Sequence, residues 1–199
     1  PFFLVLGTLA PRKNHLLLLH LWRRLAAGGG TPPRLAIVGS RCAGNPLVID
    51  LLDRCDLLRP HVAELGAASD GTVAALACAA RAVLVPSFAE GFSLPVAEAL
   101  ALGAPVLASD IPAHREVGQG VPEFLDPCDL PAWEAMVTDY ARPGSLRRAR
   151  QLAAACAWRG RSWDEHLDAV MDFLAGLLAP AAPLRAALPA RQKAEPALL

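Results

Sequence analysis

Short apolar runs alternate with longer helical patterns along most of this 199-residue chain, and this alternation constrains its fold more than any other feature. The runs are rich in Val, Leu, Ile or Phe, and several end at Gly or Pro, which is typical of buried β-strands. The predicted strands are Phe2–Leu6, Arg34–Val38, His61–Leu65, Ala82–Val85, Pro105–Ala108 and Glu123–Leu125.

The segments between the runs carry the apolar spacing of helices. Six successive βα units with continuous apolar strands predict a parallel sheet buried on both faces. Right-handed crossovers then make the fold a doubly wound, Rossmann-like α/β domain of about six strands. The predicted helices are His15–Ala27, Pro46–Leu58, Thr72–Ala80, Pro95–Leu102, Ala113–Val117, Leu130–Tyr140, Ser145–Ala157 and Trp163–Leu178.

Composition limits the classes of protein to which the chain can belong. With 54% hydrophobic and 19% charged residues it is not intrinsically disordered. Its 19 basic and 19 acidic residues balance, which gives a nucleic-acid partner no electrostatic support. We assign residues 1–179 to one domain and the Ala/Pro-rich residues 180–199 to a disordered tail.

The five cysteines are scattered and form no C-x-x-C pair. We therefore expect buried, unpaired thiols in a reducing compartment, and no metal site. No apolar run reaches the roughly 18 residues that a transmembrane helix needs.

Ligands of doubly wound sheets bind at the loops that follow the carboxyl ends of the strands. The loop after Leu6 places Arg12 and Lys13 directly before Asn14, which we expect to cap the next helix. Two cations beside the positive end of a helix dipole are unfavourable, and a bound anion would neutralise them. A solvated surface turn is the alternative.

The loop after Val85 leads into a helix with Pro95 at its predicted first position and Ser93 or Leu94 at its cap. Free backbone N–H groups of Phe92, Ser93 and Leu94 would form an anion-binding nest at this helix start. Gly91 permits the unusual backbone conformations that such a loop needs.

Two carboxylates, Glu90 and Glu98, lie eight residues apart and could face one cleft. Such a pair can serve as acid and base, hold a metal, or accept hydrogen bonds from sugar hydroxyls. Alternatively, Glu90 is a helix-dipole partner and Glu98 a solvated residue. Because the helix around Glu98 is apolar on nearly all sides, we expect its carboxylate to need a partner.

The segment Pro86–Glu98 resembles the E-x7-E signature of family-4 (group 1) retaining glycosyltransferases, usually P-S-x-x-E-G-F-G-L-P-x-x-E-A. Glu90 and Glu98 match its two glutamates, and Ser93 replaces the commoner Gly. The match covers roughly residues 3–178. Further segments agree in order: Gly7–Asn14 (donor-phosphate loop), Leu35–Gly39 (IVG), Pro105–Asp110 (PVIASD), Ala113–Val117 (REV) and the Ser162-Trp163 pair.

The resemblance implies the C-terminal, donor-binding half of a two-domain GT-B enzyme, whose N-terminal acceptor domain is absent from this chain. Arg12 and Lys13 would neutralise the donor diphosphate, Glu98 would bind the ribose and Glu90 the donor sugar. Thr8 stands where many members carry an additional Arg. The implied donor-binding residues are Gly7, Arg12, Lys13, Leu65, Glu90, Gly91, Phe92, Ser93, Leu94 and Glu98, with Arg12, Lys13 and Glu90 as the catalytic group.

The implied activity is that of a retaining hexosyltransferase that needs neither metal nor cofactor, with a GDP- or UDP-linked sugar as substrate. The R-K-N-H form of the first loop resembles bacterial mannosyltransferases of polysaccharide biosynthesis that use GDP-mannose. The acceptor would be a glycan or lipid-linked glycan, and the location cytoplasmic, peripheral at the inner face of the membrane. A GT-B nucleotide-sugar epimerase and a non-catalytic nucleotide-sugar-binding domain are the alternatives.

Overall fold

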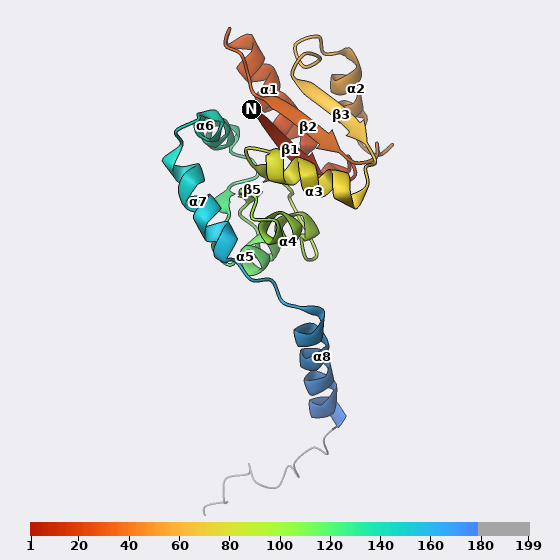
Figure 1. Cartoon of the computed structure of the whole chain (residues 1–199). Coiled ribbons are helices and arrows are strands. Elements are labelled where there is room, and N and C mark those ends of the chain that lie inside the picture. The colour runs from red at the N-terminus through yellow and green to blue at the C-terminus, as the bar shows by residue number, and fades with distance from the viewer. Residues whose placement is uncertain (179–199) are drawn as a thin grey trace, which may run out of the picture. The chain divides into compact units, whose positions relative to one another are not determined.

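The computed structural model describes residues 1–178 (Figure 1). The chain divides into two units, Pro1–Gly160 and Arg161–Leu199, of which the first contains the whole sheet. The described part of the second unit consists mainly of helix α8 (Trp163–Leu178). The predicted tail, 180–199, lies outside the described residues, so the domain boundary at 179 stays a prediction.

One sheet of six parallel strands forms the centre of the first unit, in the order β3-β2-β1-β4-β5-β6. This order confirms the predicted doubly wound fold, and every strand begins and ends within one residue of its prediction. The order reverses direction between β1 and β4, which creates a topological switch point there. The strands are β1 (Phe2–Leu6), β2 (Arg34–Val38), β3 (Val62–Gly66), β4 (Val83–Val85), β5 (Val106–Ser109) and β6 (Glu123–Leu125).

Helices cover both faces of the sheet (Figure 1). One face packs against α1, α2 and α6, and the other against α3, α4, α5 and α7. The second helix is shorter than predicted because Cys55 adopts an extended backbone and ends it. The helices are η1 (Pro11–Lys13, a 3-10 turn), α1 (His15–Ala27), α2 (Pro46–Arg54), α3 (Asp70–Ala79), α4 (Leu94–Ala101), α5 (Pro112–Gly118), α6 (Leu130–Ala141) and α7 (Leu146–Ala157).

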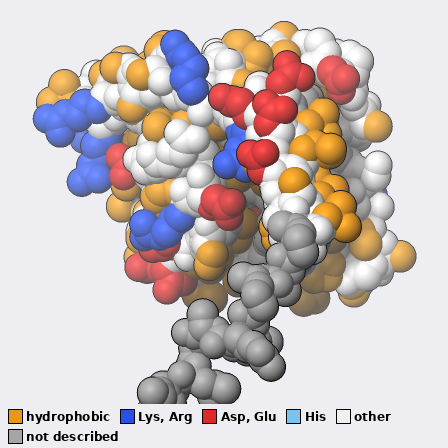
Figure 2. Space-filling view, turned by 90° about the horizontal axis from the view of Figure 1, so that it is seen from below, with side chains coloured by type: hydrophobic (Ala, Val, Ile, Leu, Met, Phe, Trp, Pro, Cys, Tyr) orange, Lys and Arg blue, Asp and Glu red, His pale blue; other side chains and the backbone are white. Residues whose placement is uncertain are grey.

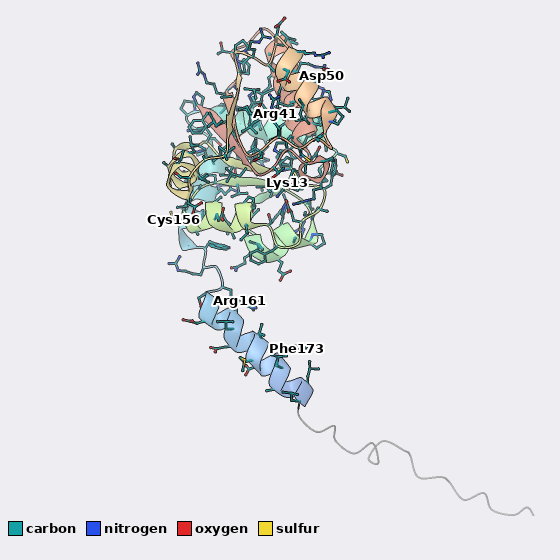
Figure 3. All side chains as sticks on the ribbon, turned by 90° about the vertical axis from the view of Figure 1, so that its right-hand side faces the viewer. Lys13, Arg41, Asp50, Cys156, Arg161 and Phe173 are labelled. Atoms are coloured by element: carbon teal, nitrogen blue, oxygen red, sulfur yellow. The ribbon has the colours of Figure 1, made fainter. Side chains whose placement is uncertain are left out.

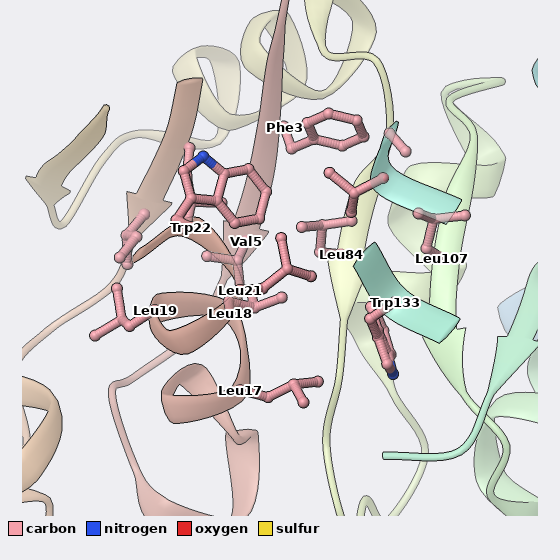
Figure 4. Packing of buried hydrophobic residues seen from close by; sticks show 14 of the residues in the cluster. Phe3, Val5, Leu17, Leu18, Leu19, Leu21, Trp22, Leu84, Leu107 and Trp133 are labelled. Atoms are coloured by element: carbon pink, nitrogen blue, oxygen red, sulfur yellow. The ribbon is translucent and has the colours of Figure 1, made fainter. Parts of the chain in front are cut away.

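Successive residues of the central strands point to opposite faces and build two separate cores. On the α1 side, Phe3 meets Trp22 edge to face, with ring centroids 5.9 Å apart (Figure 4). The Trp22 indole donates a hydrogen bond to the Pro33 carbonyl at 2.7 Å, so its polar atom is satisfied within the core. Leu4 and Val83 lie in the core of the other face.

The edge strands and the cysteines differ from the prediction. Strand β3 alternates between half-buried and exposed residues, because it has a neighbour on one side only and a covered face on one side only. Three cysteines are exposed and two are half-buried; all five are free. The expectation of buried thiols is therefore wrong. Beside Cys78 and Cys156, the neighbouring Ala77 and Ala155 take the buried positions instead.

The loops after β1 and β2 approach each other most closely at Gly39. Gly7 donates its backbone N–H to Val38, and Gly39 donates to Gly66, each at 2.9 Å. A Cβ atom on Gly39 would lie 2.0 Å from the Gly7 carbonyl oxygen, so a side chain at this position cannot be accommodated without moving a loop that lines the site described below.

We expect Gly39→Ala to lower the free energy of unfolding by about 3 kcal/mol, because backbone atoms must move apart to admit the methyl group. Gly71→Ala is the matched control: a Cβ there meets nothing within 4 Å, and its effect should stay within about 1 kcal/mol of zero. Urea denaturation of the two variants measures both values. Equal losses of unfolding free energy in the two variants would show that the close contact at Gly39 does not oppose a side chain there.

Candidate active site

The cavity of interest lies at the topological switch point, where the loops after β1 and β4 meet. Phe88 donates its backbone N–H to the Arg12 carbonyl at 2.8 Å and so joins the two loops directly. The cavity has a volume of about 490 Å³. Its lining residues are Leu6, Gly7, Arg12, Lys13, Val38, Asp70, Val73, Glu90, Phe92, Ser93, Leu94, Pro95 and Glu98.

Both cations of the first loop bind one carboxylate. Lys13 Nζ lies 2.6 Å from Glu90 Oε1, and Arg12 Nη1 lies 2.8 Å from Glu90 Oε2. The Lys13 side chain is only 11% exposed and that of Arg12 56% exposed. The alternative of a solvated surface turn is therefore wrong for Lys13, which lies in the middle of the first unit (Figure 3).

Glu90 is the centre of this cluster. Its side chain is 6% exposed and accepts a third hydrogen bond from Ser87 Oγ at 2.6 Å. Burial alone raises the pKa of Glu90, but the hydrogen bonds from Lys13, Ser87 and Arg12 and the Lys13 charge lower it more, so the net pKa lies below its ordinary value. Glu90 is thus an ionised counterion that neutralises the cation loop.

Asn14 holds the position predicted for a cap but has a different role. It precedes α1 in a left-handed conformation (φ 55°), and its side chain makes no capping hydrogen bond. Its amide instead donates to the carbonyls of Pro86 (3.1 Å) and Pro127 (2.9 Å). The buried Asn14 therefore ties together the loops that follow β1, β4 and β6.

The start of α4 carries a strained residue. Ser93 is the N-cap, as expected, but it has φ 77° and its side chain makes no capping bond. This left-handed conformation favours glycine, which explains why the signature usually has Gly where this chain has Ser. The buried Ser93 Oγ has no hydrogen-bond partner in the described structure. The helix begins at Leu94, so Pro95 takes its second position and not the first.

Glu98 differs from the prediction in its surroundings. It is exposed and lines the cavity, whereas Val96, Ala99 and Leu100 take the buried face of α4. Its carboxylate has no hydrogen-bond or ion-pair partner among residues 1–178. The expectation that burial forces a protein partner on Glu98 is wrong, because the helix buries only one of its faces.

Eight of the ten predicted donor-binding residues line the cavity; Leu65 and Gly91 do not. Leu65 lies at an exposed position of the edge strand β3, where 47% of its surface is accessible to solvent. Asp70 and Val73 of α3 were not predicted individually, although they follow the same strand end as Leu65. The Ser69 cap of α3, which accepts a hydrogen bond from the Thr72 N–H, marks that helix start in the sequence.

Two buried histidines near this edge of the sheet are held neutral. Burial and the neighbouring Lys13 charge lower the pKa of His15 to about 4. Burial also lowers the pKa of His114, whose Nδ1 lies 2.8 Å from the Ser109 carbonyl. Positive charge in the cavity lining therefore comes from Arg12 and Lys13 at neutral pH.

Among the described residues, 1–178, no cluster of His, Cys, Asp or Glu has an arrangement that could hold a metal ion. Within the same residues, no helix combines the length and apolarity required to cross a membrane.

The family model of glycosyl transferases group 1 matches residues 1–141, which include every residue of the cavity lining. This chain belongs to the family of glycosyl transferases group 1. Its fold also matches the crystal structure of TarM with a TM-score of 0.64 at 15% sequence identity, over 77% of this chain and 30% of that one. The doubly wound fold expected from the family resemblance is thereby confirmed.

The similar curated proteins in this family are bacterial mannosyltransferases. O-antigen chain mannosyltransferase B of Escherichia coli is 32% identical over 157 residues, which are 77% of this chain and 41% of that protein. The serotype-specific mannosyltransferase WbdA of Escherichia coli is 33% identical over 156 residues, 73% of this chain and 18% of that protein. The chain thus spans less than half the length of the relatives it matches.

Replacing Glu90 tests the ion cluster. We expect Glu90→Gln to lower the free energy of unfolding at pH 7 by about 1–3 kcal/mol, because two cations lose their counterion. The lowered pKa of Glu90 means that its contribution is complete above the ordinary carboxyl pKa of 4.5 and is lost as pH falls through the folded-state value. The difference between the two proteins should therefore shrink below about pH 4.5.

Urea denaturation from pH 7 to pH 3 measures this difference. The exposed Glu116→Gln is the control, since Glu116 has no ion pair among the described residues, and it should show no such trend. A Glu90→Gln effect that does not depend on pH would contradict the ionised state of Glu90.

Proposed function

We propose that this chain is the donor-binding half of a retaining hexosyltransferase that uses a nucleotide-diphosphate sugar, with GDP-mannose as the favoured donor. The observation that carries the proposal is the convergence of Arg12, Lys13 and the start of α4 on one cavity. These groups provide two charge-assisted donors and a helix N-terminus, the combination suited to a diphosphate. The mannosyltransferase relatives support the choice of sugar.

Donor binding would proceed by exchange of counterions. Without donor, Glu90 neutralises Arg12 and Lys13. The diphosphate would take over both cations, which releases the Glu90 carboxylate to accept hydrogen bonds from hydroxyls of the donor sugar. The released carboxylate would keep its hydrogen bond from Ser87 Oγ and gain those from the sugar hydroxyls, so that its charge is not left without hydrogen-bond donors.

The leaving group would be stabilised where its charge develops. As the bond between sugar and diphosphate breaks, negative charge grows on the diphosphate, where Arg12, Lys13 and the α4 N-terminus would stabilise it. The acceptor, held by the other half of the enzyme, would attack the same face of the sugar and give retention. No metal is required in this scheme, because the chain's own cations supply the positive charge.

Glu98 is suited to the ribose. Its carboxylate is exposed in the cavity, five residues after the Ser93 cap of α4, and it has no partner within residues 1–178. A free carboxylate can accept two hydrogen bonds from adjacent hydroxyls such as those of ribose. We therefore assign the nucleoside to Glu98 and the diphosphate to Arg12 and Lys13.

The double substitution Arg12→Gln/Lys13→Gln tests the diphosphate assignment. We expect the affinity for GDP to fall by roughly 100-fold or more, because charge-assisted hydrogen bonds contribute about 1.5–3 kcal/mol each. The affinity for guanosine should be unchanged. Isothermal titration calorimetry on the 199-residue chain measures both affinities, with Arg54→Gln/Arg59→Gln, two exposed arginines outside the cavity, as the control. Unaltered GDP binding in the cavity variant would refute the assignment.

The substitution Glu98→Ala tests the ribose assignment. We expect it to weaken guanosine and GDP by the same factor, on the order of 10-fold to 100-fold, because both ligands carry the ribose. The same titrations measure this effect. A loss confined to GDP would show that Glu98 acts on the diphosphate, and no loss at all would remove it from the binding site.

A further inference from the structure

A second cavity lies at the edge of the sheet opposite to the donor cavity. Glu123, the first residue of β6, lines this second cavity, whereas the donor cavity lies at the carboxyl ends of β1 and β4. Its volume of about 420 Å³ is typical of sites for small molecules. We call it the α7 cavity, and its lining residues are Val121, Glu123, Arg147, Arg150, Gln151 and Ala154. No residue lines both cavities.

The α7 cavity lies in a stretch of strong positive charge. Six arginines and no acidic residue lie between positions 141 and 162, although basic and acidic residues balance over the whole sequence. α7 lies at the left of the first unit in Figure 1, and Lys and Arg side chains gather on the same side of the view in Figure 2. Arg147 and Arg150 are three residues apart on α7, which makes them neighbours on the helix surface.

The three charged side chains of the α7 cavity are not engaged by other groups of the chain. Among residues 1–178, Glu123, Arg147 and Arg150 make no ion pair and no side-chain hydrogen bond. The nearby Asp139, in contrast, accepts a hydrogen bond from Ser145 Oγ at 2.6 Å and lies 4.0 Å from Arg142. A ligand can therefore bind to the cavity without first breaking a contact of these three residues.

The buried member of the lining, Gln151, is fixed by hydrogen bonds. Its Nε2 donates to the carbonyls of Val106 (2.6 Å) and Val121 (3.1 Å), and its Oε1 accepts from the Tyr140 hydroxyl at 2.9 Å. Burial and the charge of Glu123 raise the pKa of Tyr140, so its hydroxyl stays protonated and remains the donor. Both N–H groups of the Gln151 amide are thus used within the chain. The inner part of the cavity is therefore a rigid surface that exists before a ligand binds.

We propose that the α7 cavity binds a small phosphorylated sugar, with its phosphate on Arg147 and Arg150 and its hydroxyl groups on Glu123. Guanidinium groups bind phosphate oxygens in pairs, and a carboxylate accepts hydrogen bonds from hydroxyls. The side chains of Val121 and Ala154 offer apolar contact to the C–H groups of the sugar ring.

The carboxylate of Glu123 favours a sugar phosphate over a free phosphate ion. Both ligands can bind the arginines, but a free ion would bring its negative charge beside Glu123 with nothing between them, which is unfavourable. In a sugar phosphate the hydroxyl groups lie between the two negative charges and donate to the carboxylate. The lining thus offers a complementary group to each part of the ligand.

NMR titration of the 199-residue chain with mannose 6-phosphate, mannose and inorganic phosphate tests the proposal. We expect mannose 6-phosphate to bind most tightly and to shift the amide signals of residues 121–123 and 146–154. Arg147→Gln/Arg150→Gln should weaken this binding on the order of tenfold or more, because charge-assisted hydrogen bonds are lost. Arg23→Gln/Arg59→Gln, which removes two exposed arginines elsewhere, should leave it within about twofold of the unmodified chain.

Glu123→Ala tests the contact with the sugar. The loss of the negative charge affects mannose 6-phosphate and inorganic phosphate alike, whereas the loss of the hydrogen-bond acceptor affects the sugar alone. We therefore expect the preference for mannose 6-phosphate over inorganic phosphate to fall on the order of tenfold. An unchanged preference would remove Glu123 from the site and contradict the proposal.

Three further outcomes would overturn the proposal. Equally tight binding of inorganic phosphate to the unmodified chain would identify a site for small anions only. Unchanged binding of mannose 6-phosphate to Arg147→Gln/Arg150→Gln, with circular dichroism showing a folded protein, would move the contact away from α7. Binding that is lost in Arg12→Gln/Lys13→Gln instead would place the ligand in the donor cavity. Because the two cavities share no residue, the proposal does not depend on the proposed function.

Discussion

The ion cluster of Arg12, Lys13 and Glu90 is the interaction on which the site depends. It joins two loops that are more than 70 residues apart in sequence and that meet only because β1 and β4 are neighbours at the switch point. Without a ligand, Arg12, Lys13 and Ser87 donate to this largely buried carboxylate, and removing them without a replacement would leave a costly unpaired charge. The sheet order and the chemistry of the site are therefore coupled through one side chain.

Much of the fold could be predicted because its signals are local. All six strands and their alternation with helices follow from apolar runs punctuated by Gly and Pro, and Ser69 marks the start of α3 through its own side chain. The exposed alternation of β3 could not be predicted from Val62–Gly66 alone. It depends on the strand order, which places β3 at the edge of the sheet.

The residues of the site could be predicted from the sequence, but the ion pairs and hydrogen bonds between them could not. Spacing and helix-start chemistry single out Arg12, Lys13, Glu90 and Glu98, yet no local pattern shows that Glu90 neutralises both cations or that Glu98 is left without a partner within residues 1–178. These facts arise from long-range packing. The role of Asn14 was missed for the same reason, because its two acceptor carbonyls lie 72 and 113 residues further along the chain.

The hydrogen bonds of Asn14 also affect how the loops around the cavity meet a ligand. A single buried amide fixes the ends of three strands to one another, so the loops around the cavity are already in place before any ligand arrives. Binding to loops of this kind does not need to order a flexible segment, and the conformational entropy that would oppose association is lost during folding instead. Ligand affinity at this edge of the sheet is thus linked to the folding energetics of the whole domain.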